Sequence, residues 1–104
     1  MTMHKDLVLA IDQGTSSTKC LLLNAAGQIV ARGSAPLAET YPQPGWVSQD
    51  ALEIWESVQQ AVRACLAGQE VGAIAAVGLS TQRESYVAWQ RSDGAPLGPV
   101  ISWQ

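Results

Sequence analysis

A short polar segment after the first apolar run carries the residues best suited to chemistry: residues 12–19, DQGTSSTK. Asp12 offers the hard carboxylate oxygen that binds Mg²⁺ together with its water shell. Gly14 lets the backbone approach a phosphate. In a tight turn, hydroxyls and backbone N–H groups can bind the phosphate oxygens. Lys19 adds a positive charge. The segment does not have the G-x-x-x-x-G-K-[ST] pattern of a Walker loop. Local chemistry leaves two interpretations: a phosphate and metal site, or a polar hairpin turn in which Asp12 caps backbone amides.

A second polar stretch, Gln82-Arg83-Glu84, follows a later apolar run. Ligands of open α/β sheets gather at strand ends, so this position favours a binding site. Arg83 offers donors and Glu84 offers acceptors, a pairing that can bind vicinal hydroxyls from both sides. Trp103 can cover the CH face of a polyol or sugar while its indole N–H reaches an oxygen. The alternatives are a surface ion pair for Arg83 and Glu84 and core packing for Trp103.

Composition restricts the classes of function. The 104 residues are 47% hydrophobic and 14% charged, which excludes a disordered tail. A formal net charge of -3 without a basic cluster argues against partners such as nucleic acid or an anionic membrane surface. Cys20 and Cys65 are too few for a disulfide framework, and they fit a reduced, cytoplasmic setting as small buried hydrophobes. The single histidine, His4, argues against histidine base catalysis and most zinc sites.

The apolar runs predict the strands that position the polar segments. Residues 7–11 indicate a strand buried on both faces, and residues 19–23 and 28–35 indicate two more strands. Short turns join these three strands, which predicts an antiparallel meander. Residues 73–79 form a wholly apolar run that we expect to be a central strand.

A helix is predicted between the third and fourth strands. Asp50 and Glu53 are spaced as a capping arrangement, the following apolar residues recur at helical spacing, and Gly68 suits the helix end. Residues 86–89 and 100–103 read as a trailing hairpin. The fold class is therefore α/β, with a mixed sheet in the order β-β-β-α-β plus a hairpin. Because the chain stops directly after a strand-like run, we expect it to be a fragment.

Several stretches together resemble the FGGY family of carbohydrate kinases, and its glycerol kinases in particular. Residues 10–17, AIDQGTSS, resemble the opening of these proteins. Three further stretches agree in order and spacing: residues 41–47 (YPQPGWV), 53–55 (EIW) and 81–84 (TQRE). Residues 101–104, ISWQ, resemble the family's substrate-side tryptophan segment.

The resemblance implies a truncated actin-like, ribonuclease-H-like ATPase fold, with residues 1–104 forming the N-terminal part of domain I of an ATP-dependent kinase. It implies that Asp12 organises Mg²⁺. The residues it implies for the ATP phosphates are Gly14, Thr15, Ser16, Ser17 and Lys19. It further implies that Arg83 and Glu84 hold the hydroxyls of a small polyol or sugar, while Trp103 packs on its carbons. The catalytic base and most of the adenine pocket would lie beyond residue 104, so the chain alone is expected to have no kinase activity.

Some positions depart from the glycerol kinase pattern. Lys19 stands where these enzymes usually carry arginine, so a bidentate phosphate contact becomes a point-charge contact. Thr81 replaces the usual asparagine, and Ser16 and Thr18 differ from the usual threonine and serine. Pentulose kinases of the family usually lack the Gln-Arg-Glu run, so a glycerol-like polyol is favoured. A kinase for another sugar, such as a pentulose, is the alternative.

Other classes with the same fold fit less well. A nuclease needs several carboxylates, and Asp12 and Glu53 supply only two, because the fourth strand ends in Ser80 and Thr81. Another actin-like ATPase, such as a chaperone, is disfavoured by the polyol-site matches. A non-catalytic actin-like binding module remains an alternative. We also expect a homodimer, because a truncated sheet exposes apolar surface.

Overall fold

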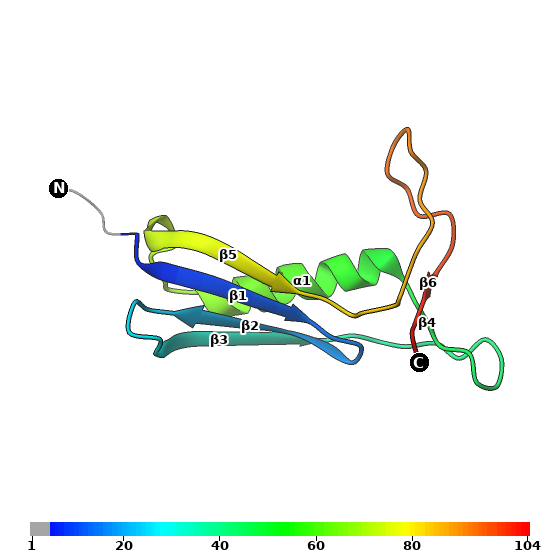
Figure 1. Ribbon diagram of the computed structural model, residues 1–104, viewed down its shortest axis with the longest axis horizontal. Helices are drawn as coiled ribbons and strands as arrows, with labels where there is room; N and C mark the ends of the chain where they lie inside the picture. Colours follow the sequence, from blue (N-terminus) through cyan, green and yellow to red (C-terminus); the bar gives the residue numbers. More distant parts are fainter. Residues whose placement is uncertain (1–4) are drawn as a thin grey trace.

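A computed structural model describes residues 5–104, and it shows a sheet with one helix layered on it (Figure 1). The four strands of the sheet are β1 (Leu7–Gln13), β2 (Ser17–Leu23), β3 (Ile29–Pro36) and β5 (Ile74–Ser80). Their order is β3-β2-β1-β5. The first three strands are antiparallel neighbours, whereas β5 runs parallel to β1. The predicted meander and mixed sheet are thus confirmed. His4, the only histidine of the sequence, lies outside the described residues.

The helix α1 (Ala51–Leu66) packs chiefly on β3 and β2. It begins where the sequence predicts, because the Asp50 carboxylate accepts a 2.8 Å hydrogen bond from the Leu52 N–H. Glu53 lies in the first turn, where the helix dipole favours a negative charge. Beyond the helix end, Gly68 adopts a φ of 75°, a left-handed conformation that glycine takes without strain. A short 3-10 turn, η1 (Val71–Ala73), then leads into β5.

The hydrophobic core lies between α1 and the sheet. Its buried members are Leu9, Cys20, Leu22, Ala35, Ala61 and Cys65. Both cysteines are free thiols, as predicted. Burial, together with the neighbouring Cys65 thiol, raises the pKa of Cys20 to about 12. The Cys20 thiol therefore stays protonated and unreactive near neutral pH.

Gly33 in β3 lies against α1 with no room for a side chain. A Cβ atom at this position would lie 2.5 Å from the Cys65 nitrogen and 3.0 Å from the Cys65 Cα, and it would also overlap the Ala61 carbonyl. These are backbone atoms, so the whole helix would have to move away from the sheet. We expect Gly33→Ala to lower the free energy of unfolding by about 2–3 kcal/mol, measured as a shift in the denaturant midpoint.

Gly98→Ala is the matched control for this substitution, because a Cβ at Gly98 meets no atom within 4 Å. The two variants share the same chemical change, and at Gly98, which lies in the loop before β6, the added methyl group meets no neighbouring atom. Equal midpoints for Gly33→Ala and Gly98→Ala would contradict the close approach of α1 to β3.

The expectation that residues 73–79 form a central strand is wrong for this chain. They form β5, which occupies an edge of the four-stranded sheet. Val77 and Leu79 are 60% and 66% exposed. A wholly apolar run is typical of a strand covered on both faces, but α1 packs chiefly on the other end of the sheet. Within residues 5–104, β5 therefore presents apolar surface to solvent.

The three tryptophans other than Trp103 are also more exposed than core packing predicts. Trp46, Trp55 and Trp89 are 57%, 58% and 58% exposed. Trp46 and Trp89 lie on irregular segments outside the two layers, and Trp55 is on an exposed side of α1. Within residues 5–104, these three side chains therefore lie at the surface and not in the core.

A second, small sheet forms at the far end of the molecule (Figure 1). It pairs β4 (Ser48–Gln49) with β6 (Val100–Ile101) in antiparallel orientation. The predicted trailing hairpin is present only as isolated bridges, Tyr86 with Ile101 and Trp89 with Pro96. The Tyr86–Ile101 bridge and a hydrogen bond from the Trp103 N–H to the Ser85 Oγ place the segment after β6 beside the segment after β5. None of the helices described in residues 5–104 has the length and apolar character to cross a membrane.

Candidate functional site

The turn between β1 and β2 holds the first group of predicted residues. The Gly14 N–H donates a 2.9 Å hydrogen bond to the Ser17 carbonyl and closes the turn. The carbonyls of Thr15 and Ser16 accept hydrogen bonds from other parts of the chain. The hydroxyls of Thr15, Ser16 and Ser17, in contrast, have no hydrogen-bond partner among the described residues. The backbone of the turn is therefore fixed while its hydroxyls are available to a ligand.

Asp12 and Lys19 lie side by side on the sheet face opposite α1. They are directly opposite each other in the β1–β2 register, so both side chains point to the same face. Their chain neighbours Gln13 and Thr18 are buried on the helix side, which leaves Asp12 and Lys19 exposed. Ser80 of β5 is the parallel partner of Asp12 on its other side. A carboxylate and an ammonium group thus face solvent at the end of β1.

The side chains of Asp12, Lys19 and the turn fit a site for phosphate and Mg²⁺. An exposed carboxylate suits Mg²⁺, which keeps several waters and takes further oxygens from phosphates. Lys19 and the turn hydroxyls are donors to phosphate oxygens. A Cβ at Gly14 would lie 3.1 Å from the Ser17 carbonyl, so this tight turn disfavours a side chain there. No group of three or more His, Cys, Asp or Glu side chains able to hold a metal occurs in the described part of the chain.

The second group of predicted residues lines one cavity. Arg83, Glu84 and Trp103 surround it together with Thr81, and its volume is about 530 Å³. The segment after β5 supplies three of these side chains, and the segment after β6 supplies Trp103. Trp103 is 57% exposed, so its ring forms a wall of the cavity and is not packed in the core. Arg83 and Glu84 form no ion pair within the described residues, unlike the exposed pair Arg63–Glu56 at 3.9 Å.

Glu84 has an unusual backbone conformation. Its φ of 65° lies in the left-handed region, and it is the one non-glycine residue with a positive φ in the described chain. That conformation costs an L-residue about 1–2 kcal/mol, because its Cβ crowds the following carbonyl. Such residues persist when the surroundings hold them, and they cluster at binding and catalytic sites.

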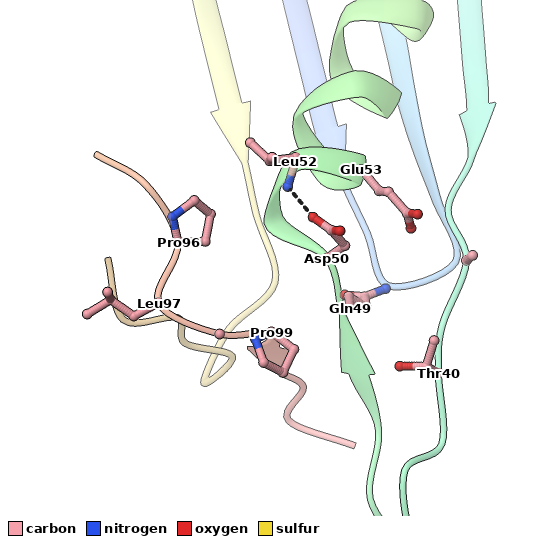
Figure 2. Close-up of a pocket in the computed structure, with 10 residues that line it drawn as sticks. Thr40, Gln49, Asp50, Leu52, Glu53, Pro96, Leu97 and Pro99 are labelled. Carbon is pink, nitrogen blue, oxygen red and sulfur yellow. Dashed lines mark hydrogen bonds between the residues drawn. The ribbon is translucent and has the colours of Figure 1, made fainter. Parts of the chain in front are cut away.

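Three glutamines connect the turn with the cavity, and the sequence alone predicts no role for them. The Gln82 Nε2 donates to the Gln49 Oε1 at 2.9 Å, and it lies 3.2 Å from the Gly14 carbonyl oxygen and 3.3 Å from the Gln13 Oε1. The Gln49 Nε2 in turn donates to the Thr15 carbonyl at 2.6 Å. Figure 2 shows the Gln49 side chain reaching from β4 to the turn between β1 and β2. Gln13 and Gln82 follow apolar runs in the sequence, which indicates strand ends but does not show that the two residues meet, and Gln49 carries no such signal.

A separate cavity of about 580 Å³ lies between the first turn of α1 and the loop before β6 (Figure 2). Glu53 lines it, and Asp50 beside it caps the helix. Asp12, by contrast, is on the sheet face opposite α1. The two carboxylates that a nuclease would need together are therefore apart, which argues further against that class.

The fold identifies the class of protein. Across 99% of this chain and 21% of the other, the structure matches a glycerol kinase from Plasmodium falciparum solved with ADP, at a TM-score of 0.86 and 26% sequence identity. A xyloylose kinase from Brucella ovis matches at a TM-score of 0.85 and 31% identity, over 91% of this chain and 20% of the other. The chain thus has the N-terminal architecture of the sugar kinases with an actin-like ATPase fold.

The sequence comparisons specify the family. Residues 7–104 match the N-terminal domain of the FGGY family of carbohydrate kinases. A glycerol kinase from Albidiferax ferrireducens is 46% identical over 99 residues, which cover 93% of this chain and 20% of that protein. An apulose kinase from Pectobacterium atrosepticum is 40% identical over 102 residues, or 98% of this chain and 21% of that protein. The chain belongs to the FGGY family of carbohydrate kinases, and it spans about a fifth of the length of these relatives.

Proposed function

We propose that the protein containing this chain transfers the γ-phosphate of ATP to a hydroxyl of glycerol or a similar polyol or sugar. One observation carries the proposal: Arg83, Glu84 and Trp103 line a single cavity that hydrogen bonds link to the turn following Asp12. Phosphoryl transfer depends mainly on positioning and charge neutralisation. This chain offers groups for both.

On the ATP side, Asp12 is the proposed ligand of Mg²⁺. The proposed phosphate contacts are Gly14, Thr15, Ser16, Ser17 and Lys19. Mg²⁺, when bound, neutralises charge on the phosphate oxygens. The available hydroxyls and the exposed Lys19 donate to those oxygens, and the fixed backbone of the turn holds the donors in place before ATP arrives.

On the acceptor side, the proposed substrate is a small neutral molecule with adjacent hydroxyls. Glu84 accepts hydrogen bonds from these hydroxyls and Arg83 donates to them, so each orients the substrate from one side. The Trp103 ring covers the carbons and excludes water from that face. These contacts orient the acceptor hydroxyl, and positioning of the reactants is one of the two main contributions to phosphoryl transfer.

The remaining catalytic parts are proposed to lie outside residues 1–104, which we assign to the N-terminal part of domain I. Relatives that this chain matches are about five times as long. We therefore propose that the catalytic base and most of the adenine pocket belong to other segments, so the chain alone has no kinase activity. We also propose a cytoplasmic location. The expected homodimer stays a prediction that light scattering of the purified protein tests.

An ADP-release assay tests the proposal, with Mg²⁺-ATP and a panel of glycerol, other polyols, pentuloses and hexoses. We expect turnover with glycerol. Turnover with another sugar and not with glycerol would support the proposed kinase activity but reject glycerol as the substrate. That outcome would be in line with the apulose kinase among the relatives. A folded protein that binds ATP and turns over no member of the panel would favour a non-catalytic binding module.

A further inference from the structure

We propose that Gln82 and Ser85 are positioning residues that fix the polyol-binding side chains and connect them to the ATP-side turn. The inference rests on the proposed function. Neither residue lines the cavity, because its walls are Thr81, Arg83, Glu84 and Trp103. Each acts through hydrogen bonds to the elements that carry those walls.

A side-chain bridge spans the dipeptide Arg83–Glu84, which is proposed to bind the substrate. The Ser85 Oγ donates a 2.9 Å hydrogen bond to the Gln82 Oε1. The two residues inside this bridge are Arg83 and Glu84, and Glu84 has the strained φ of 65°. A strained conformation needs partners that hold it, and the bridge closes the turn at both of its ends.

A further hydrogen bond extends this bridge to the opposite wall of the cavity. The Trp103 N–H donates to the Ser85 Oγ at 3.0 Å. Ser85 therefore uses its hydroxyl as donor on one side and as acceptor on the other. This single hydroxyl connects the Arg83–Glu84 turn with the backbone of the tryptophan wall, although β5 and β6 belong to different sheets.

The Gln82 amide anchors the bridge to the part of the molecule that is proposed to bind ATP. The Gln82 Nε2 donates to the Gln49 Oε1 and lies within hydrogen-bond distance of the Gly14 carbonyl. Gln49 is 2% exposed and donates to the Thr15 carbonyl. A continuous path of hydrogen bonds thus runs from Thr15 through Gln49, Gln82 and Ser85 to Trp103. The network is buried at Gln49, half-buried at Gln82 and Ser85, and exposed at Trp103. Side-chain hydrogen bonds linked in this way favour one arrangement of their members.

Kinetics of the full-length kinase test the role of each residue. Ser85→Ala is expected to raise KM for the polyol roughly three- to tenfold, as for the loss of one hydrogen bond, and to leave KM for ATP unchanged. Gln82→Leu is expected to raise KM for both substrates, because the Gln82 amide also holds the ATP-side turn. Ser85→Thr keeps the hydroxyl and is expected to restore the polyol KM. Gln60→Ala, on the exposed surface of α1, is the control for loss of a glutamine side chain and is expected to leave both KM values unchanged.

A double-mutant cycle then tests whether the two residues act as one unit. Because Ser85 and Gln82 share a hydrogen bond, the double variant is expected to raise the polyol KM by less than the product of the two single effects. Independent, multiplicative effects would overturn the proposal. So would a Ser85→Thr variant as impaired as Ser85→Ala, or a Ser85→Ala variant with unchanged kinetics.

Amide hydrogen exchange provides a readout that does not depend on activity. Ser85→Ala removes the acceptor of the Trp103 N–H, so exchange at Trp103 is expected to accelerate, while Ser85→Thr retains protection and the buried helix amide of Ala61 is unaffected. Unchanged exchange at Trp103 would reject the positioning role even in an inactive protein. A wild-type protein without turnover but with the expected exchange pattern would instead reject the proposed kinase function alone.

Discussion

If the full-length protein is the proposed kinase, replacing Asp12 by asparagine is expected to lower its kcat on the order of 10²–10³-fold. This is the usual effect of removing one group that stabilises transition-state charge. Asparagine keeps the shape of the side chain and removes only its negative charge. Asp12 is exposed and forms no hydrogen bond or ion pair among the described residues, so folding should be unaffected. Initial rates at saturating ATP and polyol, over a range of Mg²⁺ concentrations, measure the effect.

Asp6→Asn is the matched control, because Asp6 is an exposed aspartate just before β1, at the opposite end of that strand. It makes the same change in net charge far from the proposed phosphate site. If Asp12→Asn and Asp6→Asn retain equal kcat values, Asp12 is not the metal ligand. Full activity of Asp12→Asn restored by higher Mg²⁺ would show that the carboxylate affects metal affinity and not the chemical step.

Replacing Glu84 by glutamine is expected to raise KM for the polyol roughly 10–100-fold, because a hydrogen bond to a charged acceptor contributes about 1.5–3 kcal/mol. Glutamine matches glutamate in size and makes the same demand on the left-handed backbone at this position. KM for ATP is expected to change little, because Glu84 lies on the cavity side of the network and not on the turn that follows Asp12. Steady-state kinetics with each substrate varied in turn measure both constants.

Glu70→Gln is the control for this variant. Glu70 is exposed beside η1, and its side chain makes no capping hydrogen bond there. A normal polyol KM in Glu84→Gln would show that Glu84 does not bind the polyol. Equal increases in KM for the polyol and for ATP would indicate a disturbed network and not a lost substrate contact.

The sequence was sufficient to predict the elements whose signals are local. The Asp50 cap is such a signal, because side chain and amide are two residues apart. The three-stranded meander is another, because its turns are short and its strands are consecutive. The polar residues at the ends of β1 and β5 could likewise be recognised as site candidates from their types and positions, and the order of the motifs indicated the family.

Long-range pairing could not be predicted in the same way. β4 and β6 are two residues each, too short to show a strand periodicity, yet their pairing brings Trp103 to the end of β5. The edge position of β5 was missed because an apolar run does not reveal how many neighbours a strand has.

The glutamine network shows the same limit for the site itself. Gln13, Gln49 and Gln82 are separated by more than thirty residues at each step, and each is an ordinary polar residue by type. Their roles come from the parallel pairing of β5 with β1 and from the pairing of β4 with β6, which bring three chain segments to one point. The identities of the proposed ligand-binding side chains are therefore local information, whereas the contacts that hold them in place exist only in the folded chain.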